Sequence, residues 1–157
     1  MFSKIRYISL SVMVCLLVGL IASIVTQSSI DTWYFNLTKP TFTPPAWLFA
    51  PVWMLLYILM GVAMGLVLNR GLHHIWVKTA IYHFGFQLLL NTAWSIVFFG
   101  VQSPFFAFMI ILALFVVLLF TFKWFKVASP LAAYLLIPYI AWVGFAAILN
   151  FEIWRLN

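Results

Sequence analysis

Two amides and a hydroxyl interrupt an apolar stretch in the middle of the chain, where they could recognise a ligand. They recur with two aromatic rings at spacings of 4, 3, 1 and 3, and the set is Gln87, Asn91, Trp94, Ser95 and Phe98. At 3.6 residues per turn this spacing puts all five on one face of a helix. Such a face is typical of a binding wall. The alternative is that the amides only hydrogen-bond to neighbouring helices.

A matching face follows near the C-terminal end of the chain. Its residues recur at spacings of 3, 4, 3 and 1, and they are Tyr139, Trp142, Ala146, Leu149 and Asn150. Flat aromatic surfaces with a few amides are the expected lining of a small-molecule site. The two faces together therefore predict a ligand cavity between two helices.

Groups for acid–base or metal chemistry are scarce. Asp31 and Glu152 are the only carboxylates, so no paired acid and base is evident. The three histidines do not follow metal-ligand spacing, and we expect no metal site. His83 could bind haem iron, with a core or interfacial role as the favoured alternative. Cys15 is the single cysteine, which excludes a disulfide framework.

The composition shows which elements must position these side chains. Hydrophobic residues make up 67% of the chain and charged residues 6%, whereas soluble domains carry about 25% charged residues. Five apolar stretches of about 18 to 22 residues match a hydrocarbon core of about 30 Å. The chain is therefore predicted to be an all-α membrane protein, a single domain over residues 1–157 built as a bundle of five transmembrane helices. These helices are expected at about 7–26, 47–68, 79–100, 105–122 and 131–151.

The connection between the first two predicted helices, at about 27–46, is unusually long. Loops of roughly twenty residues in compact domains are lids, binding loops or disordered segments. Disorder is not expected here, because disordered segments are poor in aromatic residues. This connection and the start of the next helix contain Trp33, Tyr34, Pro44, Trp47 and Trp53. We predict an ordered aromatic lid over the cavity.

The eight Lys and Arg residues divide unevenly if the five helices alternate in direction. Lys39 and Arg155 fall on the side of the lid, and all the others fall on the opposite side. The positive-inside rule then predicts a cytoplasmic N-terminus in an inner membrane, and it leaves an outer membrane open. The first stretch is too long for a signal-peptide core and is expected to be a retained helix. The net charge of +6 arises from these flanks, so it does not indicate nucleic-acid binding.

A GxxxG pattern, Gly61 to Gly65, lies in the second predicted helix. Small residues at this spacing let another helix approach closely. Packing within the same bundle is the favoured interpretation, and a contact between two copies is the alternative.

Three long motifs resemble those of the translocator protein family, also called TspO/MBR or the peripheral-type benzodiazepine receptor, in its bacterial type. The first motif contains Trp33-Tyr34, Leu37, Lys39-Pro40, Pro44-Pro45, Trp47, Pro51-Val52-Trp53, Leu56-Tyr57 and Met60-Gly61. The second contains Gln87-Leu88, Leu90-Asn91, Ala93-Trp94 and Phe98-Phe99-Gly100. The third contains Ser129 to Ala133, Leu135-Leu136, Pro138-Tyr139, Ala141-Trp142, Phe145-Ala146, Leu149-Asn150 and Trp154-Arg155.

The resemblance implies a five-helix bundle, often a homodimer, that binds protoporphyrin IX, haem or benzodiazepine-type molecules beneath the lid and needs no cofactor. By motif, the pocket would be lined by Tyr34, Pro44, Trp53, Asn91, Trp94, Trp142 and Ala146. To these we add four further residues as ligand-binding candidates: Trp47, Gln87, Phe98 and Asn150. The sterol-recognition pattern of the family is broken here, because Phe151 and Glu152 occupy the region before Arg155 where a tyrosine is required.

Three functions follow as hypotheses. The first is a membrane carrier or sensor for tetrapyrroles, whose propionates would need a cation such as Lys39 at the cavity mouth. The second is an enzyme that degrades porphyrin oxidatively, because Trp53 and Trp142 match the tryptophans that the family links to that chemistry. The third is a scaffold with an incidental cavity.

Overall fold

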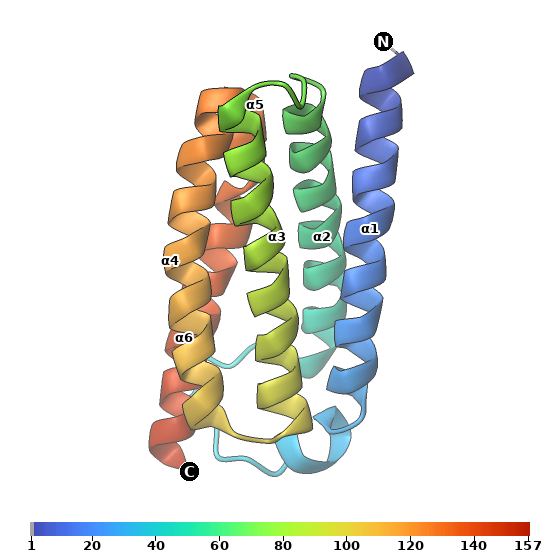
Figure 1. The fold of residues 1–157 in the computed structure, drawn as a ribbon. Helices are drawn as coiled ribbons and strands as arrows, with labels where there is room; N and C mark the ends of the chain where they lie inside the picture. Colours follow the sequence, from blue (N-terminus) through green and yellow to red (C-terminus); the bar gives the residue numbers. More distant parts are fainter. Residues whose placement is uncertain (1) are drawn as a thin grey trace.

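The computed structural model describes residues 2–157, and this part of the chain is helical, with no strand. Five long helices run beside one another: α1 (Phe2–Gln27), α2 (Ala46–Leu68), α3 (Ile75–Ser95), α4 (Pro104–Ala128) and α6 (Ile137–Leu156) (Figure 1). Three short elements complete the fold: the one-turn π-helices η1 (Ile30–Tyr34) and η2 (Ile96–Gly100), and α5 (Pro130–Leu135). The connection over residues 28–45 and the C-terminus lie at one end of the bundle, and the N-terminus lies at the other (Figure 1).

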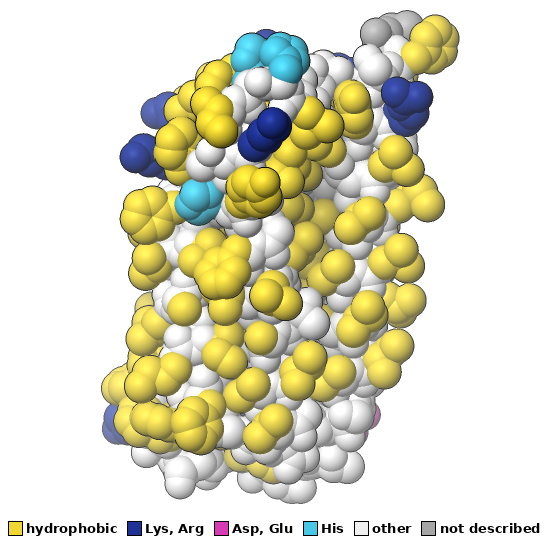
Figure 2. Space-filling model, in the orientation of Figure 1, with side chains coloured by type: hydrophobic (Ala, Val, Ile, Leu, Met, Phe, Trp, Pro, Cys, Tyr) yellow, Lys and Arg dark blue, Asp and Glu magenta, His cyan; other side chains and the backbone are white. Residues whose placement is uncertain are grey.

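Within residues 2–157, four segments are long and apolar enough to cross a membrane: α1, α2, α4, and α5 together with α6. The third helix is less apolar, because its inward face carries Gln87, Asn91 and Ser95, all of which are buried. Exposed apolar side chains cover the middle of the visible face, while cations and histidines gather near the N-terminal end (Figure 2).

Several predicted boundaries were wrong in detail. The first helix begins at Phe2, and the third begins at Ile75 and passes into η2 at Ile96. The predicted fifth helix is broken at Leu136, because Pro138 cannot donate the backbone hydrogen bond of a continuous helix.

The GxxxG pattern packs α1 directly onto α2. A Cβ at Gly61 would lie 2.4 Å from the Val12 Cα, and one at Gly65 would lie 2.4 Å from the Ile8 Cα. Only glycine therefore allows these two backbones to approach so closely. The prediction of packing within the bundle is confirmed, and a homodimer stays a prediction.

Candidate functional site

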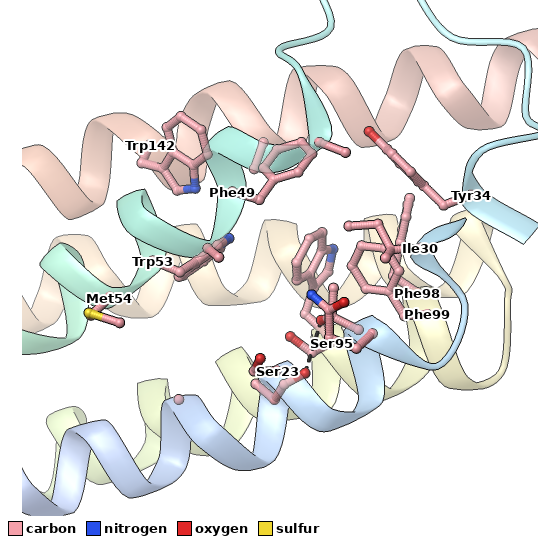
Figure 3. Close-up of a pocket in the computed structure, with 18 of the residues that line it drawn as sticks. Ser23, Ile30, Tyr34, Phe49, Trp53, Met54, Ser95, Phe98, Phe99 and Trp142 are labelled. Atoms are coloured by element: carbon pink, nitrogen blue, oxygen red, sulfur yellow. Dashed lines mark hydrogen bonds between the residues drawn. The ribbon is translucent and has the colours of Figure 1, made fainter. Parts of the chain in front are cut away.

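A cavity of about 270 Å³ lies in the half of the bundle next to the 28–45 connection (Figure 3). Its walls come from α1, η1, α2, the junction of α3 with η2, and α6. Between α1 and α2 the lining includes Leu20 and Met54, which are also exposed on the outer surface. The cavity is therefore partly open toward the apolar surroundings of the bundle.

Trp53 is the centre of the aromatic wall. Its ring centroid lies 5.9 Å from Tyr57, 6.3 Å from Trp94, 6.3 Å from Tyr139 and 6.5 Å from Trp142. Aromatic rings at such separations attract one another beyond the effect of burial. The α2 backbone thus holds Trp53 where the surfaces of three helices meet.

The π-turn η2 supplies a second aromatic group. Trp94 stacks on Phe98 at 5.3 Å, and Phe98 contacts Phe99 at 4.8 Å. One-turn π-helices insert an extra residue into a helix and recur at functional sites. Here both Phe98 and Phe99 line the cavity together with Ser95.

Gln87 and Asn91 do not line this cavity; they belong to a buried hydrogen-bond network beside it. The Tyr57 hydroxyl donates to Asn91 Oδ1 at 2.6 Å, and Asn91 Nδ2 donates to the Tyr139 hydroxyl at 2.7 Å. Tyr139 in turn donates to Gln87 Oε1 at 2.7 Å. The network joins α2, α3 and α6, so the two amides make the interhelical hydrogen bonds that the sequence left as an alternative.

Asn150 both lines the cavity and joins three elements. Its Oδ1 accepts from Trp94 Nε1 at 3.0 Å, and its Nδ2 donates to the Pro104 carbonyl at 2.8 Å. These bonds fix the Trp94 ring, and Ala146 leaves space one turn before Asn150 on α6. The predicted residues that the structure brings together are Tyr34, Trp53, Trp94, Phe98, Trp142, Ala146 and Asn150.

Among residues 2–157, two buried polar side-chain atoms have no hydrogen-bond partner, the Tyr34 hydroxyl and Trp142 Nε1. Both residues line the cavity, on either side of Phe49, whose ring centroid is 6.2 Å from each of their rings. Burial raises the pKa of Tyr34 to about 12, so its hydroxyl keeps its proton. Buried polar groups normally have partners, and these two have none among residues 2–157.

Lys39 stabilises the 28–45 connection and is not part of the cavity lining. Its ammonium donates to the carbonyls of Tyr34, Phe35 and Leu37 at 2.9, 3.2 and 3.1 Å. It also lies 4.8 Å from the centroid of the Tyr34 ring. Desolvation lowers the pKa of Lys39. Since an ammonium has three N–H groups, all of its donors are occupied.

Pro44 and Trp47 also lie outside the main cavity. Pro44 borders a shallow hollow between the 28–45 connection and α6. Trp47, in the first turn of α2, is 72% exposed. Contact of Pro44 and Trp47 with a ligand stays a prediction.

His83 faces away from the cavity. Its Nδ1 lies 2.8 Å from the Thr79 carbonyl, and its ring lies 6.4 Å from both Phe120 and Trp124 on α4. Haem iron inside the cavity is therefore beyond its reach. The described chain contains no cluster of three or more His, Cys, Asp or Glu residues that could hold a metal ion.

Sequence reasoning missed the wall that α1 provides. Seven lining residues come from this helix: Leu16, Gly19, Leu20, Ala22, Ser23, Thr26 and Gln27. Small and hydroxyl side chains at 19, 22, 23 and 26 recur with helical spacing, and this was the available signal. Phe49, Phe99 and Phe145 were missed because apolar rings in an apolar chain carry no distinguishing pattern.

These features define a helical protein of the membrane with an internal, aromatic-walled binding cavity. The TspO/MBR family model matches residues 11–155, and the chain belongs to this family. It is accordingly an integral, multi-pass membrane protein.

Named relatives span bacteria and mammals. The tryptophan-rich protein TspO of Chlorobaculum tepidum is 40% identical over 100% of this chain and 99% of its own length. The translocator protein of Homo sapiens is 39% identical over 80% of this chain and 75% of its own. The tryptophan-rich sensory protein of Cereibacter sphaeroides is 35% identical over 81% of this chain and 78% of its own.

Proposed function

We propose that this protein binds tetrapyrroles such as protoporphyrin IX and haem, and related flat hydrophobic molecules of the benzodiazepine type, as a membrane carrier or sensor. The observation that carries the proposal is the aromatic cavity enclosed by four long helices beneath the 28–45 connection. Relatives named translocator and sensory proteins agree with both roles.

The walls suit a flat macrocycle. Trp53, Trp94, Phe98 and Trp142 present rings from three sides, and each aromatic contact adds roughly 0.5 to 1.5 kcal/mol beyond burial. The volume of about 270 Å³ is slightly below the usual range for ligand pockets, about 300 to 1,000 Å³. A tetrapyrrole therefore requires an outward movement of the 28–45 connection or of α1.

A second candidate is oxidative or light-dependent porphyrin degradation through Trp53 and Trp142. One observation favours it: the two indole rings lie 6.5 Å apart, with Trp94 a further 6.3 Å from Trp53. This arrangement places three oxidisable rings against any bound ligand. Such chemistry would need dioxygen as the oxidant, with light as the energy source in the light-dependent case, and no acid–base pair.

We also propose a membrane topology with five crossings, an orientation and a homodimer. The third helix and η2 would form a fifth crossing, because they lie alongside α4 for most of its length (Figure 1). The polar residues in the middle and C-terminal part of α3, Gln87, Asn91 and Ser95, are buried, where lipid does not reach them. With this crossing, the positive-inside rule supports a cytoplasmic N-terminus in an inner membrane. A homodimer remains part of the proposal on the strength of the family resemblance.

Binding is tested by titrating the purified protein in lipid nanodiscs with protoporphyrin IX, following the porphyrin absorbance and tryptophan quenching. We expect saturable binding by the wild type. The variant Ala146→Phe fills the cavity and should lose at least tenfold in affinity, whereas Ala113→Phe, at an exposed position on α4, should bind normally. Absence of saturable binding would refute the proposal, and equal binding by the two variants would place the ligand elsewhere.

The Asn157 side chain hydrogen-bonds the 28–45 connection to the end of α6, and replacing this side chain should speed ligand release. Its Oδ1 accepts from the Thr38 amide at 3.1 Å, and its Nδ2 donates to the Thr38 carbonyl at 2.8 Å. Each such bond contributes about 0.5 to 1.5 kcal/mol, so Asn157→Ala should raise the dissociation rate of protoporphyrin about three- to tenfold.

Stopped-flow measurement with an excess of apomyoglobin as acceptor gives this rate. The matched control is Asn36→Ala, because Asn36 bonds only to Thr32 within the same connection. If both variants released ligand at the wild-type rate, this connection would not limit release.

A further inference from the structure

Positive charge is concentrated at the N-terminal end of the bundle, and among residues 2–157 no carboxylate side chain lies there to balance it. Asp31 in η1 and Glu152 near the end of α6 are the only acidic residues of the chain, and both lie at the opposite end (Figure 1). The cations at the N-terminal end are all exposed: Lys4, Arg6, Arg70, Lys78, Lys123 and Lys126. Their counter-charges therefore have to come from outside the protein.

His83 lies in the seam between α3 and α4, near this end. Its half-buried ring lies 6.4 Å from both Phe120 and Trp124 on α4. Its Nδ1 lies 2.8 Å from the Thr79 carbonyl. Because a carbonyl only accepts, Nδ1 carries the hydrogen, and Nε2 of the neutral ring is an acceptor. An ionisable side chain at membrane depth is a candidate functional group, and this one presents an acceptor in the seam.

Lys123 lies at the same level of the membrane as His83. The His83 ring is equally distant from Phe120 and Trp124, so it faces the turn of α4 that contains Lys123. The Lys123 ammonium lies 5.4 Å from the centroid of the Trp124 ring. The 25 residues of α4 span about 37 Å, which exceeds a hydrocarbon core of about 30 Å. The last turns of α4 therefore reach the lipid headgroups, where a lysine can extend its ammonium to a phosphate.

Apolar side chains continue the same surface toward the middle of the membrane. Val116, Phe120 and Lys123 recur at spacings of 4 and 3, so they form one stripe of α4. Val116 and Phe120 are each 50% exposed, and Phe86, one turn after His83, is 51% exposed. Figure 2 shows apolar side chains below the cations and histidines of the visible face. A charged rim above an apolar stripe matches a lipid, whereas a soluble anion would use the rim alone.

We infer that the α3–α4 seam at the N-terminal end binds an anionic phospholipid of the phosphatidylglycerol class. Lys123 pairs with the phosphate, and His83 Nε2 accepts a hydrogen bond from a headgroup hydroxyl. An acyl chain lies along the stripe formed by Val116 and Phe120. Basic pockets between membrane helices commonly bind anionic headgroups. His83 faces away from the aromatic cavity, so this site is separate from the proposed function and does not depend on it.

Three lipids with the same acyl chains test the inference on the full chain in detergent. Phosphatidylglycerol carries one negative charge and two hydroxyls, phosphatidylmethanol keeps the charge but lacks the hydroxyls, and phosphatidylcholine is zwitterionic. Native mass spectrometry gives the affinity for the first bound lipid. We expect phosphatidylglycerol to bind about three- to tenfold more tightly than phosphatidylmethanol, because of one hydrogen bond, and at least tenfold more tightly than phosphatidylcholine.

Variants assign the two contacts. Lys123→Gln should weaken binding of both anionic lipids about fivefold and leave phosphatidylcholine unchanged. His83→Phe keeps a ring against Phe120 and Trp124, and it should abolish the preference for phosphatidylglycerol over phosphatidylmethanol. The matched control is Lys4→Gln, which removes the same charge at the same end of the bundle but on α1, and it should bind lipid like the wild type.

Equal binding of phosphatidylglycerol and phosphatidylcholine by the wild type would overturn the inference. Equal losses in Lys123→Gln and Lys4→Gln would also overturn it, because the attraction would then be diffuse. Equal binding of the two anionic lipids would remove the role of His83. Displacement of the lipid by millimolar glycerol phosphate would show a site for soluble anions instead. None of these results depends on the protoporphyrin titration.

Discussion

Replacing Gly61 or Gly65 with valine should detach α1 from α2 and abolish ligand binding. The new Cβ atoms would lie 2.4 Å from the Cα atoms of Val12 and Ile8. Backbone atoms cannot escape by changing rotamer, so the whole helix has to move. Overpacking of this kind costs about 1 to 3 kcal/mol and sometimes more, and the cavity also loses the wall that α1 provides. We expect affinity for protoporphyrin to fall more than tenfold.

The single cysteine gives a direct measure of this separation. Cys15 lies on α1 and is 1% exposed in the packed bundle. Its labelling by a membrane-permeable maleimide should be slow in the wild type and much faster in Gly61→Val and Gly65→Val.

The matched control is Gly85→Val, because a Cβ at Gly85 meets nothing within 4 Å while the substitution carries the same helix-propensity change. Wild-type labelling and stability in all three variants would mean that α1 does not need these glycines to pack.

The long helices could be predicted from the sequence because its apolar stretches have the length of a membrane crossing. Those stretches located the five long helices, although several predicted ends differ from the structure by four to six residues. Apolar length is a strong signal because a helix that crosses lipid must be continuous and apolar. Helical spacing also located the faces bearing Trp94 and Trp142. Spacing cannot show how deep a side chain lies, however. Asn91 shares its face with Trp94, yet the nearby hydroxyls of Tyr57 and Tyr139 hold Asn91 in a network beside the cavity.

The part that could not be predicted depends on partners far apart in the sequence. Lys39 was expected to meet a ligand because it is the one cation of the long connection, but the fold of that connection brings three carbonyls to it. The wall formed by α1 is rich in small side chains. Such side chains are common in membrane helices, so they indicate a wall only once α2 and α3 are placed around them. The orphaned Tyr34 hydroxyl could be recognised only from the structure.

Replacing Trp53 with alanine should produce the largest loss of any single change in the cavity. The indole contacts four aromatic residues at 5.9 to 6.5 Å, so its removal leaves a void between α2, α3 and α6. Large-to-small substitutions of tryptophan lower the free energy of unfolding by about 3 to 5 kcal/mol. We expect a markedly lower midpoint of thermal unfolding and loss of measurable protoporphyrin binding.

Trp47→Ala is the matched control, because Trp47 lies six residues earlier in the same helix and is 72% exposed. Its midpoint of thermal unfolding should match that of the wild type. If Trp47→Ala lost as much stability as Trp53→Ala, the interior cluster would not be the source of the effect.

Trp53→Phe separates binding from chemistry at the same position. A phenyl ring keeps an aromatic contact with the ligand, so protoporphyrin affinity should stay within about tenfold of the wild type, because a single aromatic contact is worth roughly 0.5 to 1.5 kcal/mol. A phenyl ring is much harder to oxidise than an indole. If the protein degrades porphyrin through its tryptophans, illumination in air should bleach the bound porphyrin in the wild type but not in Trp53→Phe. Bleaching at the wild-type rate in this variant and in Trp142→Phe would leave the protein a binder whose indoles only shape the cavity.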